Sequence, residues 1–188
     1  MKKLLVALFL TTIIGLTVSA QKTLNGITLP ATIKKDTTQL LLNGAGIRKK
    51  VFFKLYVAGL YLQSKTKNPN DIINGDKEML MRLTITSGMI SSSNMSEAIE
   101  EGFKKSMNGN TAPLKSQIDI FINTFKKEEI KEGDLFEIWY TPNVGVQPYK
   151  NGKLQNTIPG LDFKKAVFGI WFSTNPVDED LKKALLGL

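Results

Sequence analysis

Residues 40–62, LLLNGAGIRKKVFFKLYVAGLYL, form the longest apolar and β-rich run beyond the N-terminal segment. The glycines in 43–46 predict a turn, and the aromatic and β-branched residues that follow predict one long strand, covered on both sides, to position 62. Side chains alternate along a strand, so odd positions from 51 to 61 are expected to form a core face. The even face begins with Arg48 and Lys50 and then becomes apolar. This pattern is typical of a strand that runs from solvent into a covered cavity.

The 188-residue chain contains neither cysteine nor histidine. It therefore has no disulfide, no thiolate nucleophile and no Ser-His-Asp triad. The usual ligands of zinc, copper and haem iron are also missing, so we expect no metal site and no cofactor. Any catalysis would have to use arginine, lysine, tyrosine, carboxylate or hydroxyl groups.

Residues 1–20, MKKLLVALFLTTIIGLTVSA, have the pattern of a secretory signal peptide. Two lysines precede an apolar segment from Leu4 to about Leu16, and small residues end the stretch, which predicts cleavage before Gln21. A membrane anchor is the alternative, but polar residues and a glycine interrupt a run that is too short to span a bilayer. No later segment is long and apolar enough to span one. We therefore expect an exported protein, located in a bacterial periplasm.

Residues 21–188 are expected to form one domain with a substantial core. The formal charge of +8 falls to +6 when Lys2 and Lys3 leave with the signal peptide. The excess lies in Lys-Lys pairs spread along the chain, a distribution typical of solvated surfaces. Export argues against a nucleic-acid partner, whereas anionic lipids and acidic small molecules remain candidate partners.

Strands are expected first and helices mostly in the second half, which predicts an α+β fold. A capping box at Asn94 and Glu97 predicts a helix over 95–107, and Thr111 is expected to cap the next one. Asn-Gly at 151–152 predicts a hairpin. Further strands are predicted at 26–30, 39–42, 78–86, 134–141, 145–149 and 153–158, and further helices at 71–74, 161–172 and 175–187.

Arg48 and Tyr56 are the candidate ligand-binding residues. An arginine guanidinium can hold a carboxylate or an enolate-like oxygen through two parallel hydrogen bonds, and a phenol can add a third donor. The alternatives are a solvent-exposed arginine, with or without an aspartate partner, and a tyrosine buried for packing. Eight residues of straight strand span about 26 Å. A bulge or bend near 49–53 would be needed for both side chains to reach one small anion; otherwise they would contact different parts of a ligand.

GAGIR at 44–48 and YVAGLY at 56–61 resemble the chalcone isomerase superfamily, in particular its non-catalytic, chalcone isomerase-like branches. The resemblance implies an antiparallel sheet backed by a layer of helices, with a cavity between them. In the plant enzymes an arginine in such a segment holds the substrate oxyanion. In the related fatty-acid-binding proteins the arginine is kept and a tyrosine contacts the carboxylate. The matching residues are Arg48 and Tyr56.

The enzymes of this superfamily also carry a tyrosine, a lysine and an asparagine on the first helix after the sheet. The matching positions hold Met95, Ala98 and Gly102, which cannot transfer a proton, and a later polar position falls near Ala166. No catalytic residue is therefore assigned, and the resemblance implies non-catalytic binding of a fatty acid or similar amphipathic carboxylate. The residues expected to contact it are Arg48, Phe52, Tyr56, Met95, Ile99 and Phe103.

Two other functions remain open from the sequence. One is an intramolecular lyase in which Arg48 stabilises an oxyanion and Tyr56 donates a proton; a second ionisable side chain beside Arg48 would favour it. The other is a protein-interaction domain whose cavity is filled by its own side chains.

Overall fold

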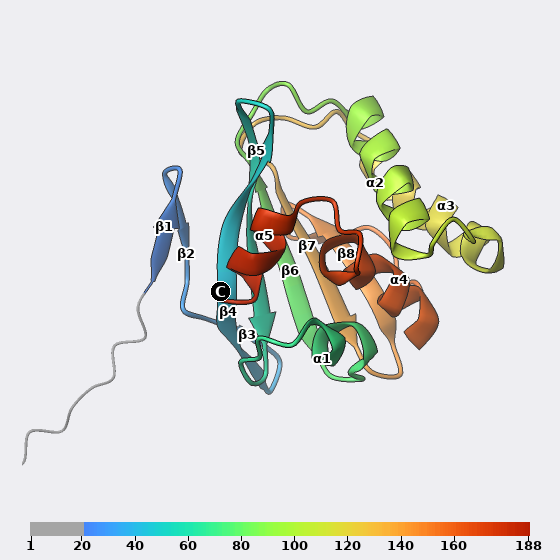
Figure 1. The fold of residues 1–188 in the computed structure, drawn as a ribbon, viewed down its shortest axis with the longest axis horizontal. Coiled ribbons are helices and arrows are strands. Elements are labelled where there is room, and N and C mark those ends of the chain that lie inside the picture. Colours follow the sequence, from blue (N-terminus) through green and yellow to red (C-terminus); the bar gives the residue numbers. More distant parts are fainter. Residues whose placement is uncertain (1–20) are drawn as a thin grey trace, which may run out of the picture.

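The structure is a computed structural model that describes residues 21–188; the signal peptide expected at 1–20 lies outside the described residues. Its centre is a seven-stranded antiparallel sheet in which strand order follows chain order (Figure 1). The strands are β3 (Thr32–Lys35), β4 (Thr38–Lys50), β5 (Phe53–Leu62), β6 (Met79–Ile85), β7 (Leu135–Thr141), β8 (Gly145–Lys150) and β9 (Lys153–Leu154). A separate hairpin of β1 (Lys22–Leu24) and β2 (Ile27–Leu29) precedes them.

Helices cover one face of this sheet (Figure 1). They are α1 (Pro69–Asn74), α2 (Ser92–Ser106), the 3₁₀ turn η1 (Ala112–Leu114), α3 (Lys115–Lys126), α4 (Leu161–Phe172) and α5 (Glu179–Leu185). Within the described part of the chain, no helix is long and apolar enough to cross a membrane. The predicted α+β architecture, an antiparallel sheet backed by helices, is confirmed.

Strand β5 is buried on both faces, but the larger core lies on its even face. Tyr56, Ala58 and Leu60 belong to the core beneath the helices. Val57 and Tyr61 point the other way, into a smaller cluster that includes residues of the β1–β2 hairpin. The expected odd core face therefore holds only from position 57 onward, since the odd residues before it are exposed or only partly buried.

The predicted turn at 43–46 is wrong. Strand β4 continues through these residues with a bulge between Leu42 and Gly44, and the chain reverses only at Val51-Phe52. The glycines serve packing instead: a Cβ on Gly44 would lie 2.3 Å from the Ala184 carbonyl oxygen, and one on Gly46 would lie 2.8 Å from the Ala184 Cβ. Glycine at these positions allows α5 to pack directly on β4.

The boundaries of the other helices and strands differ less from the predicted ones. Helix α2 begins three residues early because Ser91, with Asn94, forms the capping box. Thr111 makes no capping hydrogen bond, and η1 separates it from α3. Strand β9 is short, and beyond it Gln155 and Ile158 hydrogen-bond to the β8 backbone at Pro148 and Val146. Helix α4 has its predicted limits.

An aromatic cluster holds α2, α3 and α4 together. Phe103 is fully buried, with its ring centroid 5.8 Å from that of Phe121 and 5.9 Å from that of Phe163. Phe125 stacks on Phe136 of β7 at 4.9 Å, which ties α3 to the sheet. Truncating such a buried ring typically costs about 3–5 kcal/mol. These contacts fix the helices over the sheet.

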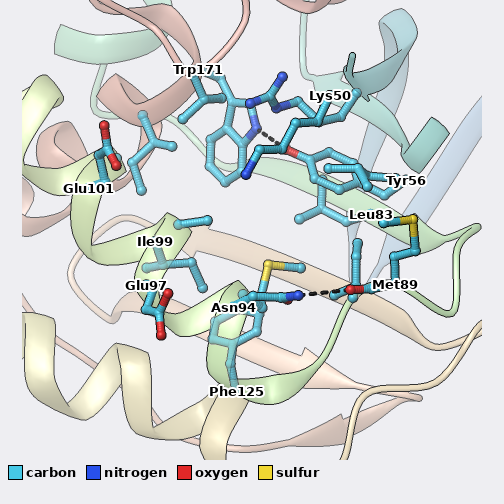
Figure 2. Close-up of a pocket in the computed structure, with 18 of the residues that line it drawn as sticks. Lys50, Tyr56, Leu83, Met89, Asn94, Glu97, Ile99, Glu101, Phe125 and Trp171 are labelled. Atoms are coloured by element: carbon cyan, nitrogen blue, oxygen red, sulfur yellow. Dashed lines mark hydrogen bonds between the residues drawn. The ribbon is translucent and has the colours of Figure 1, made fainter. Parts of the chain in front are cut away.

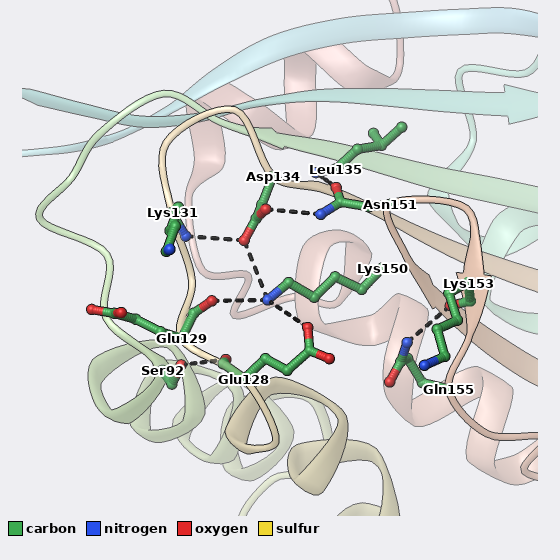
Figure 3. A network of polar contacts seen from close by, with 10 residues as sticks. All are labelled: Ser92, Glu128, Glu129, Lys131, Asp134, Leu135, Lys150, Asn151, Lys153 and Gln155. Carbon is green, nitrogen blue, oxygen red and sulfur yellow. Dashed lines mark hydrogen bonds and ion pairs between the residues drawn. The ribbon is translucent and has the colours of Figure 1, made fainter.

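A buried lysine ties the 127–134 loop to the sheet (Figure 3). The Lys150 Nζ donates to the Glu129 carbonyl oxygen at 2.9 Å and lies 3.3 Å from an Asp134 oxygen. Asp134 also accepts from the Asn151 amide and the Lys131 N–H. Burial acts to raise the pKa of Asp134, but these bonds and the lysine charge together hold that pKa below its usual value. The ionised carboxylate therefore stabilises this end of the sheet.

A second buried lysine closes the end of α1. The Lys164 side chain has no exposed surface, and its Nζ donates to the carbonyl oxygens of Ile72, Ile73 and Gly75. These oxygens belong to the end of α1, where carbonyls lack helical partners. Burial lowers the pKa of Lys164 to about 8, and nearby Asp76 opposes this shift. The lysine thus joins α4 to α1.

Candidate ligand site

A cavity of about 630 Å³ lies between the sheet and the helices (Figure 2). This volume falls within the range of about 300–1,000 Å³ typical of small-molecule sites. Most of the wall is apolar and comes from β5, β6, β7, α2, α3 and α4. The main apolar residues are Leu55, Leu83, Met95, Ile99, Phe121, Phe125, Ile138 and Ile170.

The polar groups of the cavity lie on two sides. Arg48, Lys50 and Tyr56 come from the β4–β5 hairpin. Figure 2 shows Lys50 and Tyr56 beside Trp171, with Glu97 and Glu101 on α2 away from them. The hairpin side of the cavity is therefore cationic, whereas the α2 side carries two carboxylates, of which Glu101 is paired with Lys105 at 3.5 Å. An anionic group of a ligand would favour the hairpin side.

Arg48 and Tyr56 are directly opposite each other on neighbouring strands. Such pairs have Cβ atoms about 4.5–5.5 Å apart. The separation of about 26 Å expected from a single straight strand is wrong, because the chain turns back between the two residues and also bulges between Arg48 and Lys49. Both side chains can therefore reach one small anion.

Arg48 has a structural partner. Its Nη1 lies 3.0 Å from an Asp178 carboxylate oxygen, and Asp178 caps α5 by accepting the Leu181 N–H at 2.9 Å. At the other end of α5, the Asn43 side chain donates to the Leu185 carbonyl oxygen. The Nε and Nη2 donors of Arg48 have no hydrogen-bond partner within residues 21–188. The arginine thus positions α5 and retains donors for a ligand.

The Tyr56 hydroxyl is arranged to donate a hydrogen bond. Its oxygen lies 3.3 Å from the Trp171 indole nitrogen, and an indole N–H can only donate. In the described part of the chain, the hydroxyl hydrogen itself has no acceptor. Burial raises the pKa of Tyr56, although the Trp171 bond and the Arg48 charge oppose this. The phenol is therefore neutral near pH 7 and can donate to a ligand oxygen.

The other expected contact residues divide into two pairs. Met95 and Ile99 line the cavity. Phe52 and Phe103 do not: Phe52 is 92% exposed at the hairpin turn, and Phe103 is fully buried in the aromatic cluster. The reversal at Val51-Phe52 places Phe52 outside, whereas Phe103 lies one helical turn beyond Ile99, where α2 packs on α3 and α4.

Lys50 and Trp171 also line the cavity but were not predicted as ligand contacts. The sequence pattern could have indicated Lys50, because this residue lies on the same even face of the predicted strand as Arg48 and Tyr56. No sequence pattern indicated Trp171, because its contact with Tyr56 joins residues 115 positions apart.

The helix positions that resemble enzyme positions carry no proton-transfer group. Met95, Ala98 and Gly102 all line the cavity. A Cβ on Gly102 would lie 2.9 Å from the Ile170 side chain, so close packing of α2 on α4 requires glycine there. Within residues 21–188 there is also no cluster of three side chains able to hold a metal ion. The arrangement suits binding of an anionic head and an apolar tail.

Comparisons with known proteins agree with this architecture. The family model described as chalcone isomerase-like matches residues 21–187. A solved fatty-acid binding protein of Arabidopsis thaliana superposes with a TM-score of 0.71, covering 89% of this chain and 96% of that one at 18% identity. At this identity the likeness shows the fold. A search of curated proteins finds no match. Sheet topology, cavity and family match together identify the chain as a member of the chalcone isomerase-like family.

Proposed function

We propose that this protein is an exported, non-catalytic binder of a fatty acid or a similar amphipathic carboxylate. The observation that carries the proposal is the pairing of Arg48 with Tyr56, both with unused donors, beside an apolar cavity. The structural likeness to a protein named for fatty-acid binding supports the same ligand class. Export rests on the signal-peptide pattern of residues 1–20.

In this proposal the carboxylate lies between the hairpin side chains. The Arg48 guanidinium and the Tyr56 hydroxyl donate to it, and the Lys50 ammonium adds a favourable charge. The tail extends along the apolar wall, which includes Met95 and Ile99. The opposite orientation would bring the carboxylate toward the acidic side chains of α2, where like charges repel.

Catalysis is not part of the proposal because the cavity lacks a tuned acid–base pair on the hairpin side. A general base works best with a pKa near the working pH, and burial moves the pKa of Tyr56 away from it. An arginine guanidinium has five N–H donors and no acceptor atom. These two groups can hold an anion, but neither can remove a proton.

The second candidate is the intramolecular lyase. The observation in its favour is that Tyr56 stands directly opposite Arg48, so a proton donor adjoins an oxyanion-stabilising group. An absorbance assay with a chalcone substrate separates the two functions. We expect no turnover above background; saturable turnover abolished by Tyr56→Phe would favour the lyase. The open cavity gives no support to the interaction domain with a filled cavity.

The binding proposal is tested by fluorescence titration with hexadecanoic acid and hexadecanol. Trp171 lines the cavity, whereas Trp139 belongs to the cluster on the other face of the sheet. The acid should change the fluorescence with one-to-one stoichiometry and bind more tightly than the alcohol. The Trp171→Phe variant is the control that should lose the signal and retain binding. Absence of acid binding, or equal affinity for both compounds, would refute the proposal.

A further inference from the structure

The tip of the β4–β5 hairpin exposes three consecutive apolar side chains. Val51, Phe52 and Phe53 are 78%, 92% and 50% exposed. Figure 1 shows this tip extending past the neighbouring strands, close to the connection between β6 and α2. In that connection Met89 is 52% exposed. Together these four residues form an apolar apex at one end of the molecule.

Positive charge surrounds this apex. Lys49, Lys50 and Lys54 are exposed on the hairpin, and no acidic residue occurs between positions 47 and 62. The nearby Arg48 is paired with Asp178, so the three lysines supply the local excess. Apolar and basic side chains in one small patch match the acyl and phosphate layers of an anionic bilayer.

The tip sequence does not serve the turn itself. Lys50 pairs with Phe53, so Val51 and Phe52 form a two-residue turn in which Val51 has φ +57°. A β-branched residue seldom adopts a positive φ, and Gly or Asn is strongly preferred there. Three other two-residue hairpin turns occur in residues 21–188, at 25–26, 36–37 and 151–152. Their first residues also have a positive φ and are Asn25, Asp36 and Asn151. Hairpin formation alone would therefore favour Asn, Asp or Gly rather than valine at position 51.

The apex also borders the cavity. Val51, Phe53 and Met89 contribute to the cavity lining as well as to the exposed surface. A molecule entering between the hairpin and α2 would pass these side chains. A partner that covers the apex would therefore lie beside this route between the hairpin and α2.

We propose that the apex docks on an anionic lipid bilayer, inserting Val51 and Phe52 while the surrounding lysines contact lipid phosphates. Docking would place the cavity entrance at the membrane surface, where an amphipathic acid partitions. Transfer of an amphipathic acid between the bilayer and the cavity rests on the proposed function, whereas docking does not. A second copy of the chain fits the apex less well, because apposed tips would bring like charges together.

The test is vesicle co-sedimentation of the protein from Gln21 onward, since the apolar segment of residues 4–16 would itself bind lipid. Vesicles are made of phosphatidylcholine alone or mixed with phosphatidylglycerol. The protein should bind the mixed vesicles, more weakly as salt is added. Phe52→Asn should reduce the partition coefficient about tenfold, the scale of one buried aromatic ring. Lys49→Gln should reduce it about fivefold.

Matched controls come from strand β9. Leu154→Asn changes another exposed apolar residue, and Lys153→Gln changes another exposed lysine; both should bind like the wild type. A variant with Asn-Gly at 51–52 should retain the fold, unfold at a higher temperature because the turn is relieved of strain, and lose vesicle binding.

Three results would overturn the docking proposal. They are no binding to the mixed vesicles, an equal loss in the β9 controls, and sedimentation showing a dimer that depends on Phe52. Acid binding measured without vesicles is the separate readout for the proposed function. Because Phe52 does not line the cavity, Phe52→Asn should leave it unchanged.

Discussion

Replacing Asp178 with asparagine is expected to strengthen acid binding, whereas replacing Arg48 with alanine weakens it. Asp178 holds one nitrogen of Arg48 at 3.0 Å and places a negative charge beside the proposed carboxylate position. Asparagine removes that charge and can still cap α5, because asparagine is as good an N-cap as aspartate. The two substitutions therefore separate the ligand role of Arg48 from its role at α5.

The expected magnitudes follow from the contacts. A unit charge about 4 Å away is worth about 1 kcal/mol in a water-like environment, so Asp178→Asn should lower the Kd for the acid about fivefold. Arg48→Ala removes a charged hydrogen bond and should weaken the binding free energy of the acid by about 1.5–3 kcal/mol. Loss of this ion pair, whose side chains are 23% and 14% exposed, should cost about 0.5–1 kcal/mol of folding stability in either variant.

Both variants are measured by the Trp171 titration with hexadecanoic acid and hexadecanol, and by urea unfolding. The alcohol is the control ligand, because its tail contacts are the same and its head carries no charge. A weaker affinity of Asp178→Asn for the acid would contradict the reasoning. Equal losses for acid and alcohol in Arg48→Ala would show that the arginine serves the fold alone.

The remaining predictions concern single side chains. Tyr56→Phe should weaken acid binding by about 0.5–1.5 kcal/mol in the same titration, because one neutral hydrogen bond is lost; an unchanged Kd would exclude the tyrosine from the site. Lys164→Met should cost about 3–5 kcal/mol in urea unfolding, because three buried carbonyls lose their donor. The folded-state pKa of Asp134 is lowered, so its stabilisation is complete above its unfolded pKa of about 3.9 and is lost as pH falls through the folded value. Urea midpoints should fall over that acidic range in the wild type and fall less in Asp134→Asn. Gly44→Ala should cost about 1–3 kcal/mol through a clash with the Ala184 carbonyl, and an unchanged urea midpoint would contradict the packing role.

Patterns within one segment were predictable from the sequence. Helix α4 occupies its predicted range because its periodic apolar residues, including Phe163 and Val167, all contact the core. The alternation in residues 78–86 likewise predicts β6 within one residue at each end. Such signals depend on local periodicity, which packing here reinforces.

The hairpin turn was not predictable by the same reasoning. Val51-Phe52 has no turn chemistry, whereas Gly44 and Gly46 resemble a turn and instead make room for α5, which follows far along the chain. Packing against that distant helix overrides the local preference of the glycines. With the turn predicted at 43–46, Arg48 and Tyr56 were expected far apart on one strand, whereas the fold pairs them on neighbouring strands.

Two contacts of the site were equally unpredictable from the sequence. Arg48 pairs with Asp178 and Tyr56 with Trp171 across 130 and 115 positions. No spacing rule joins such residues, because the order of the strands and helices brings them together. The sequence indicates which side chains bear the chemistry, and the fold determines their partners.

Native mass spectrometry of the protein purified from its own host, without added lipid, shows whether the cavity holds a carboxylic acid. We expect one bound molecule per chain, with the mass of a long-chain carboxylic acid, and its loss from Arg48→Ala purified in parallel. A wild-type protein that carries no ligand, or an Arg48→Ala protein that keeps the same ligand, would contradict this expectation.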